Sequence, residues 1–343
     1  MTYNDLYENE ISVFCKDNDF MFLRNKKILL SGATGLIGSY FVDSLLCNKD
    51  FDVQIYALVR NKSTAQTRFL KHINDKRLTF VETDLSKEID FNKNVDYVLH
   101  LASNTDPKNY ALFPVETMIT NFYGCKNLLD VAVRCKAKKF FLASSCEIYG
   151  TSEEEMFEEN CGKVNPMDVR SSYNESKRAS ETLCVAYNKE FNISTVIGRF
   201  CRIFGPTAKP TDTKALSQFI KKAINEEDIV LKSEGNQKYS YLYVSDAVAG
   251  MLCLLEKGQD AEAYNISEDK NIMSLKEIAN YIAKQKNVNV VFSLPSKSEM
   301  NAYSRAINSI LKIDKIKKLS WQPKVTFKDG LNKTIEYFNS QEK

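Results

Sequence analysis

A short strand, a glycine-rich turn and a helix follow one another near the start of the chain, and this stretch most constrains the fold. An apolar run at 28–30 precedes Gly32, Gly35 and Gly38, and apolar residues at 40–46 mark one helix face. Glycines let a phosphate approach backbone N–H groups, and a helix N-terminus attracts an anion. The turn therefore predicts a dinucleotide pyrophosphate site, with a Gly-x-x-Gly-x-x-Gly spacing one residue wider at the front than the common fingerprint. On this stretch alone, an ordinary strand-to-helix turn remains the alternative.

The composition of the chain excludes several classes of protein. With 343 residues, 43% hydrophobic and 27% charged, the chain is typical of a soluble globular protein with one large or two modest domains. The net charge of +3 is dispersed, so we expect no nucleic-acid partner, and the basic cluster at 312–318 predicts a solvated helix face. Nine cysteines without a Cys-x-x-Cys pair fit reduced thiols, and two histidines make a histidine-built metal site unexpected. Residues 1–20 read as a surface helix and not as a signal peptide, and no apolar run would span a membrane, so we expect a cytoplasmic protein.

Alternating strand and helix patterns follow the first helix. Apolar runs at 53–59, 78–82, 95–101 and 138–145 predict parallel strands, and 114–136 predicts a long amphipathic helix. This order is typical of an α/β fold with a Rossmann-like, doubly wound parallel sheet.

Arg60 follows the predicted strand 53–59, where a dinucleotide fold meets the adenosine ribose. An acidic residue there would bind a 2′-hydroxyl, whereas a basic one would pair with a 2′-phosphate. Arg60 therefore favours NADP(H), and NAD(H) remains possible.

Candidate catalytic residues follow the predicted strand 138–145 and lie on the next helix. Ser145 and Glu147 stand at the carboxyl end of the strand, where ligands collect in such sheets. Tyr173 and Lys177 lie one turn apart on one helix face. A nearby ammonium would lower the tyrosine pKa below its free value of about 10, which would make Tyr173 a general base.

The order of these motifs resembles the extended short-chain dehydrogenase/reductase family, which includes the nucleotide-sugar epimerases and dehydratases. The resemblance spans Lys26 to about Phe338, and further matching segments are Asp84-Leu85, Leu101-Ala102-Ser103, Asn121-x-x-Gly124, Ser145–Gly150, Phe204–Pro206, Tyr241–Asp246 and Leu319–Pro323. It implies that Tyr173 is the acid/base, that Lys177 holds the nicotinamide ribose and that Ser145 hydrogen-bonds the reacting oxygen. Glu147 falls where dehydratases and decarboxylases of the family keep a glutamate. The cofactor would lie along Gly32, Ala33, Thr34, Gly35, Leu36, Ile37, Arg60, Asp84, Leu85, Leu101, Ala102, Ser103, Asn121, Tyr173 and Lys177.

Three positions depart from the family pattern. Family dehydratases have an Asp-Glu pair where this chain has Cys146-Glu147. A thiol is a poorer proton donor to a leaving hydroxyl than a carboxylic acid, so dehydration is disfavoured. Many members have an arginine where Tyr239 stands and an asparagine where Arg202 stands, so Arg202 either supplies the missing charge or points elsewhere. The expected substrate-binding residues are Ser144, Cys146, Arg202, Lys238 and Arg305.

The resemblance also implies a domain organisation and a choice of functions. We expect an NAD(P)-binding domain at 21–199 with 239–258, a smaller C-terminal α/β substrate-binding domain at 200–238 with 259–343, and a helical extension at 1–20. A homodimer would form through the helices at 114–136 and 173–190. The first hypothesis is redox-neutral epimerisation or decarboxylation of a nucleotide-linked sugar, since Ser-Cys-Glu looks most like the Thr-Ser-Glu of nucleotide-sugar decarboxylases. An NADPH-dependent reductase of a keto group is the alternative, and a non-catalytic nucleotide-binding protein is disfavoured by the intact Ser145, Tyr173 and Lys177.

Overall fold

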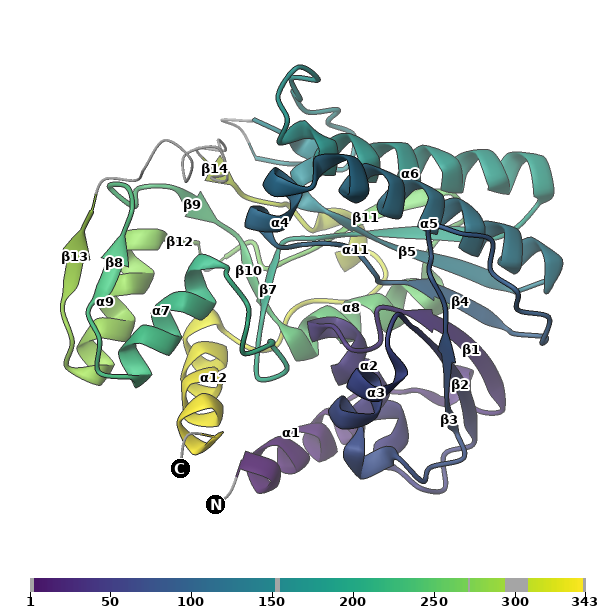
Figure 1. Cartoon of the computed structure of the whole chain (residues 1–343), viewed down its shortest axis with the longest axis horizontal. Helices are drawn as coiled ribbons and strands as arrows, with labels where there is room; N and C mark the ends of the chain where they lie inside the picture. The colour runs from purple at the N-terminus through teal and green to yellow at the C-terminus, as the bar shows by residue number, and fades with distance from the viewer. Residues whose placement is uncertain (1–2, 152–154, 271, 294–307, 342–343) are drawn as a thin grey trace.

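A seven-stranded parallel sheet lies at the centre of the computed structural model, which describes residues 3–151, 155–270, 272–293 and 308–341 (Figure 1). The strands run in the order β11-β6-β5-β4-β1-β2-β3. Their bounds are β1 Lys26–Ser31, β2 Val53–Val59, β3 Leu78–Glu82, β4 Tyr97–His100, β5 Lys139–Ser145, β6 Thr195–Phe200 and β11 Glu262–Ile266. The chain builds outward from β1 in one direction and then, from β4, in the other, so the predicted doubly wound sheet is confirmed.

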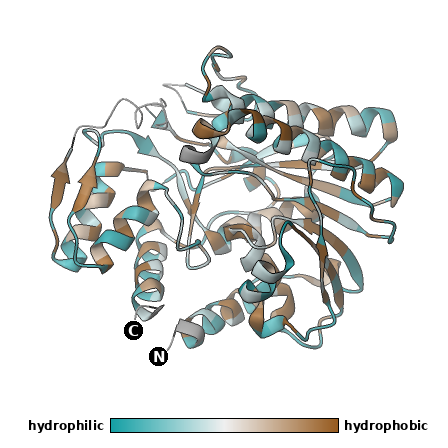
Figure 2. Cartoon of the chain, in the orientation of Figure 1, coloured by the Kyte–Doolittle hydropathy of each residue, from teal (hydrophilic) through white to brown (hydrophobic). Residues whose placement is uncertain are grey.

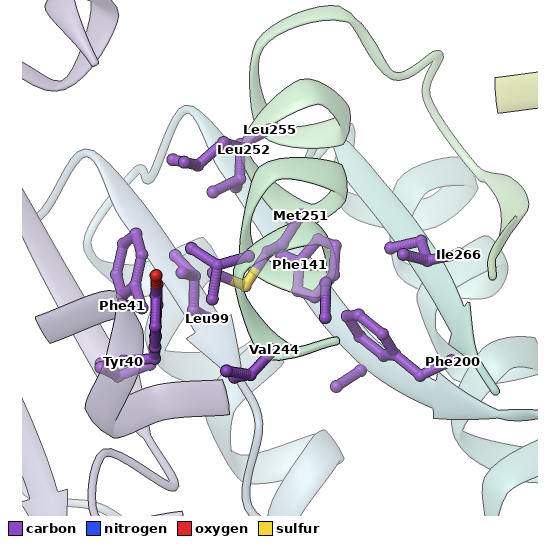
Figure 3. Packing of buried hydrophobic residues seen from close by; sticks show 14 of the residues in the cluster. Tyr40, Phe41, Leu99, Phe141, Phe200, Val244, Met251, Leu252, Leu255 and Ile266 are labelled. Carbon is purple, nitrogen blue, oxygen red and sulfur yellow. The ribbon is translucent and has the colours of Figure 1, made fainter. Parts of the chain in front are cut away.

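Two helical layers cover the two faces of this sheet. Alternate strand residues point to opposite faces, so Leu29 and Phe140 join one apolar cluster whereas Ile28 and Phe141 join the other. Helices α5 (Pro114–Arg134) and α6 (Ser171–Phe191) cover the first face, and α2 (Leu36–Cys47) and α8 (Val244–Lys257) cover the second. Figure 3 shows Tyr40 and Phe41 of α2 beside Met251 of α8 and Leu99 of β4. The central strands are largely apolar along their length, as expected for a sheet buried on both faces (Figure 2).

A second, smaller part of the fold lies beside the carboxyl ends of the strands, at the left in Figure 1. Its own apolar cluster joins α7 (Ala215–Ile224), α9 (Leu275–Lys286) and α12 (Phe327–Gln341). Its short strands are β7 Arg202–Phe204, β8 Ile229–Leu231, β9 Lys238–Tyr239, β10 Tyr241–Tyr243, β12 Met273–Ser274, β13 Val290–Phe292 and β14 Asn308–Ser309. The remaining helices are α1 Tyr3–Asp17, α3 Lys62–Arg68, α4 Pro107–Leu112, α11 Asp314–Lys317 and the 3-10 helices η1 Met21–Leu23, η2 Leu70–His72 and η3 Cys146–Tyr149.

Two expectations need correction at this level. The strand β11 lies inside the predicted substrate domain, but it pairs with β6 in the large sheet, so that boundary is wrong at 262–266. The rest of the domain division stays a prediction. The basic cluster at 312–318 is only partly a solvated face: Lys318 is exposed, whereas Lys312, Lys315 and Lys317 are half-buried and pair with carboxylates of Glu155, Glu262 and Asp269.

In the part of the chain that the structure describes, none of the helices combines the length and the hydropathy that a transmembrane segment needs.

Candidate active site

A cavity of about 800 Å³ lies between the carboxyl ends of the strands and the smaller part of the fold. Its wall includes the glycine turn, the end of β5, the start of α6 and residues of α7 and β8. The glycine turn and the predicted catalytic residues are therefore brought to one cavity, as expected at the carboxyl edge of a doubly wound sheet.

The glycine turn has room only for glycine at two of its positions. Gly32 has a positive φ of 76°, and a Cβ there would come within 2.6 Å of the Ala102 backbone nitrogen. A Cβ on Gly38 would come within 2.2 Å of the Gly32 carbonyl oxygen. Helix α2 starts directly after Gly35, which provides no side-chain cap, and Gly35, Leu36 and Ile37 line the cavity. The uncapped N–H groups of this helix start, beside a close backbone turn, fit the pyrophosphate of a dinucleotide.

Ser145 and Tyr173 face the cavity from neighbouring elements. Ser145 ends β5 and caps the 3-10 helix η3, where its Oγ accepts a hydrogen bond from the Glu147 backbone N–H at 3.2 Å. The Tyr173 side chain is buried, and its ring stacks on that of Tyr110 with centroids 5.1 Å apart. The phenol of Tyr173 is thereby fixed in direction next to the serine.

Burial governs the pKa values of Tyr173 and Lys177. Loss of water raises the pKa of Tyr173 above its ordinary value, although a hydrogen bond with Ser145 acts against this. The Lys177 ammonium donates to the Ala143 carbonyl oxygen at 2.8 Å, and burial lowers its pKa to about 8. The expectation that the tyrosine pKa lies below 10 is therefore wrong for this structure, because the desolvation of the phenolate outweighs the hydrogen bond with Ser145.

Two arginines flank Glu147, two residues after Ser145. Arg170, at the start of α6, places its Nη2 atom 3.2 Å from Glu147 Oε2. Arg202, from β7, places its Nη2 atom 3.9 Å from the other carboxylate oxygen. The guanidinium carbon of Arg202 also lies 3.5 Å from the ring centroid of Tyr239, within cation–π range.

The predicted cofactor residues divide into two groups. Gly32, Gly35, Leu36, Ile37, Leu101, Ser103, Tyr173 and Lys177 line the cavity. Ala33, Thr34, Arg60, Asp84, Leu85, Ala102 and Asn121 are outside the lining of the cavity in the described part of the chain. Asn121 instead contacts a residue of the cavity lining, because its amide oxygen accepts a hydrogen bond from the Ser103 hydroxyl at 2.8 Å. The amide nitrogen of Asn121 donates to the Ser176 hydroxyl at 3.0 Å. It thus ties a cavity residue to α6.

The edge strands β2 and β3 carry the residues predicted to meet the adenosine. Arg60 is exposed at the end of β2. Asp84 is also exposed, and hydrogen bonds from Ser86 lower its pKa, with a smaller contribution from the charge of Arg60. Leu85 is buried in the sheet core.

The expected substrate residues other than Arg202 differ in their surroundings. Ser144 lines the cavity, but its hydroxyl donates to Glu181 at 2.5 Å, and Glu181 is in turn paired with Arg199. Lys238 is exposed and outside the cavity lining, because its neighbour Tyr239 takes the inward position of β9 and successive strand residues alternate. Arg305 lies outside the described residues. Cys146 lines the cavity, and burial raises the pKa of its thiol, so it remains protonated.

Sequence reasoning missed two residues of this site. Tyr110 belongs to α4, a short helix with no clear pattern in the sequence. Arg170 stands three residues before Tyr173, a helical spacing that places the two side chains on neighbouring positions of one face and could have drawn attention to it.

Comparison with known proteins identifies similar chains. The model of the NAD dependent epimerase/dehydratase family matches residues 28–267. UDP-glucuronic acid decarboxylase 1 of Xenopus tropicalis is 32% identical over 324 residues, which cover 92% of this chain and 73% of that protein. UDP-glucuronic acid decarboxylase 3 of Arabidopsis thaliana is 32% identical over 310 residues, which cover 90% of this chain and 87% of that protein. The solved structure of an epimerase from Methanothermobacter thermautotrophicus has a TM-score of 0.81 at 21% identity, covers 97% of this chain and 96% of its own, and shows the same fold.

Proposed function

This chain belongs to the NAD dependent epimerase/dehydratase family, as its sequence predicts, and we propose that it removes carbon dioxide from a nucleoside-diphosphate-linked uronic acid without net oxidation. The predicted family and the prediction of an enzyme are confirmed. The convergence of the glycine turn, Ser145, Tyr173 and Glu147 on one cavity carries the proposal. The relatives named UDP-glucuronic acid decarboxylases, similar over nine-tenths of the chain, support this substrate class.

The cavity residues have distinct parts in such a reaction. NAD(P) bound against the glycine turn would supply a hydride acceptor for the C4 carbon of the sugar and later return the hydride. Tyr173 takes the proton of the C4 hydroxyl, and Ser145 hydrogen-bonds the same oxygen. The resulting ketone is β to the carboxylate, so the C5–C6 bond breaks, its electron pair forms the enolate at O4, and C6 leaves as carbon dioxide. C5 then gains a proton from water as the enolate returns to the ketone, and the C4 alcohol is restored by the hydride and the proton that Tyr173 took.

The direct test is to incubate the protein with UDP-glucuronate and either NAD⁺ or NADP⁺. We expect release of carbon dioxide and formation of a UDP-pentose, detected by mass spectrometry, with no stoichiometric build-up of reduced cofactor. Unchanged UDP-glucuronate would refute the proposal. Oxidation of NADPH with keto-sugar nucleotides would instead support the reductase alternative.

Replacing Tyr173 with phenylalanine tests the assigned acid/base. We expect turnover to fall by about 10² to 10⁴-fold, since this is the usual contribution of a positioned proton donor and acceptor. Cofactor binding, measured by calorimetry, should be retained. Tyr187→Phe is the matched control, because Tyr187 lies on the same helix and donates to Asp130 away from the cavity. A fully active Tyr173→Phe enzyme would remove the tyrosine from this role.

Preference for NADP(H) stays a prediction that rests on Arg60. The exposed guanidinium at the end of β2 is available to a 2′-phosphate, and Asp84 is the acidic group beside it. We expect Arg60→Ala to weaken NADP⁺ binding more than NAD⁺ binding in a titration of each cofactor. Equal weakening of both, or tighter binding of NAD⁺ by the unaltered protein, would contradict the preference.

A further inference from the structure

The side chain of Arg202 is held in one orientation by three neighbours. Its guanidinium carbon lies 3.5 Å from the centre of the Tyr239 ring, a distance that places the two groups in direct contact. Arg202 pairs with Tyr241 in the register of β7 and β10, and Tyr239 lies two residues earlier on the same side of the chain. Glu147 forms an ion pair with the guanidinium, with 3.9 Å between Nη2 and Oε1. Arg202 lines the cavity with its side chain in this orientation.

The hydrogen-bonding capacity of this guanidinium is not used up. The Nη1 atom of Arg202 is buried and has no hydrogen-bond partner in the structure. The contact with Glu147 is an ion pair at 3.9 Å, longer than a hydrogen bond. A buried donor of a charged group is costly to leave unpaired, so its retention beside a cavity indicates that a ligand atom completes it.

The charged side chains near Ser145 favour an anionic ligand. The Glu147 carboxylate is shared between Arg170 and Arg202, and its contact with Arg202 is the longer of the two. A neutral sugar would leave the buried Arg202 guanidinium with this one long ion pair, whereas a ligand carboxylate would pair with it directly. Glu147 is two residues from Ser145, so the charge lies at the reacting end of the sugar.

We propose that Arg202 binds the carboxylate of the uronic acid and that Tyr239 is a positioning residue that holds the guanidinium flat toward it. The inference rests on the proposed function and names the residue that selects a uronic acid over a neutral sugar. Two parallel N–H groups of arginine match the two oxygens of a carboxylate. Selectivity for the charged sugar therefore comes from β7 and not from Lys238 on β9.

The test is a comparison of binding by calorimetry, with UDP, UDP-glucose and UDP-glucuronate as the three probes. We expect Arg202→Gln to weaken UDP-glucuronate at least tenfold and to change UDP and UDP-glucose less than twofold, because a truncated partner leaves a buried carboxylate unpaired. Lys221→Gln is the matched control, since it removes the same charge from an exposed position on α7 outside the cavity lining. Circular dichroism of each variant shows that it is folded.

Other outcomes would overturn the inference. Equal weakening of all three probes would place the guanidinium on the diphosphate, and unchanged binding of UDP-glucuronate would remove it from the site. If the Arg202→Gln protein fails to fold, Arg202→Lys takes its place, because lysine keeps the charge but lacks the two parallel N–H groups. We expect Arg202→Lys to bind UDP-glucuronate at least threefold more weakly than the wild type and to bind UDP equally well.

The positioning role of Tyr239 is tested separately, by two substitutions that differ in whether an aromatic ring remains. Tyr239→Phe keeps a ring beneath the guanidinium and should keep the selectivity for UDP-glucuronate over UDP-glucose. Tyr239→Leu should reduce that selectivity without changing the affinity for UDP. Identical behaviour of the two variants would contradict the role.

Failure of the inference and failure of the proposed function are distinguishable. Binding selectivity is measured without turnover, so selective binding without release of carbon dioxide would leave Arg202 assigned and refute decarboxylation. If the protein releases carbon dioxide but Arg202→Gln binds UDP-glucuronate as tightly as the wild type, decarboxylation would be supported and the role of Arg202 refuted.

Discussion

At the scale of single residues, the burial of the Lys177 ammonium costs stability. Lys177 is almost fully buried, with a carbonyl oxygen as its hydrogen-bond partner, and its pKa is lowered to about 8 from an ordinary value of 10.5. A charged group with such a shift destabilises the folded state wherever it remains protonated. Residues of this kind are expected at active sites, where a structure retains them for function.

The pH dependence of stability tests the burial of Lys177. Between pH 8 and about 10.5 the folded state holds fewer protons on this group than the unfolded state, so the free energy of unfolding rises with pH. Relative to Lys177→Met, we expect the wild type to gain about 2 kcal/mol between pH 8 and pH 10 in urea unfolding. Lys189→Met, at an exposed position of the same helix, should show no such difference. A constant difference between wild type and Lys177→Met over this range would contradict the buried ammonium.

Among the elements, α1 shows how one helix joins parts that are distant in the chain. Its Glu10 carboxylate accepts hydrogen bonds from Tyr40 of α2, Tyr243 at the start of α8 and Tyr337 of α12, at 2.9 to 3.3 Å. Burial raises the pKa of Glu10, and these phenols and Lys333 act against that shift. The predicted N-terminal helix is therefore part of the packed structure.

Replacing Glu10 with glutamine should destabilise the protein. The neutral amide offers one acceptor oxygen where the charged carboxylate offers two to Tyr40, Tyr243 and Tyr337, so these buried hydrogen bonds are weakened, and we expect a loss of about 1 to 3 kcal/mol in the free energy of unfolding. Glu8→Gln, at an exposed position of the same helix, should change it by less than about 0.5 kcal/mol. Equal effects of the two substitutions would show that the carboxylate does not hold the three elements.

At the scale of the whole molecule, the helices α5 and α6 leave apolar side chains uncovered beside each other. Val115, Met118, Ile119 and Tyr123 of α5 are exposed, with Val185 and Phe191 on α6. Positions 115, 118, 119 and 123 follow a helical period, so they form one stripe. The homodimer expected from the sequence stays a prediction, and this stripe is the face that it would cover.

Sedimentation of wild type and of Ile119→Glu tests the dimer. We expect the wild type to sediment as a dimer and the variant as a monomer, because a carboxylate would be buried without a partner at the centre of the interface. Val13→Glu places the same charge on an exposed apolar position of α1 and should leave the dimer intact. A monomeric wild type would rule out the predicted assembly.

The sequence by itself determined the parallel sheet and the residues at its carboxyl edge. Alternation, strand length and glycine spacing are local properties, so β1, β2, β3, β5, α2, α5 and α6 were predicted close to their observed bounds, and Gly32, Ser145 and Tyr173 were identified with them. Only the tertiary structure decided the pKa direction of Tyr173, the outward position of Lys238 and the partner of Ser144, because each depends on water exclusion or on a group distant in the chain. It also placed β11 in the large sheet and the Arg202 guanidinium on the Tyr239 ring, since the contact between β7 and β9 joins residues 37 positions apart that no local pattern relates.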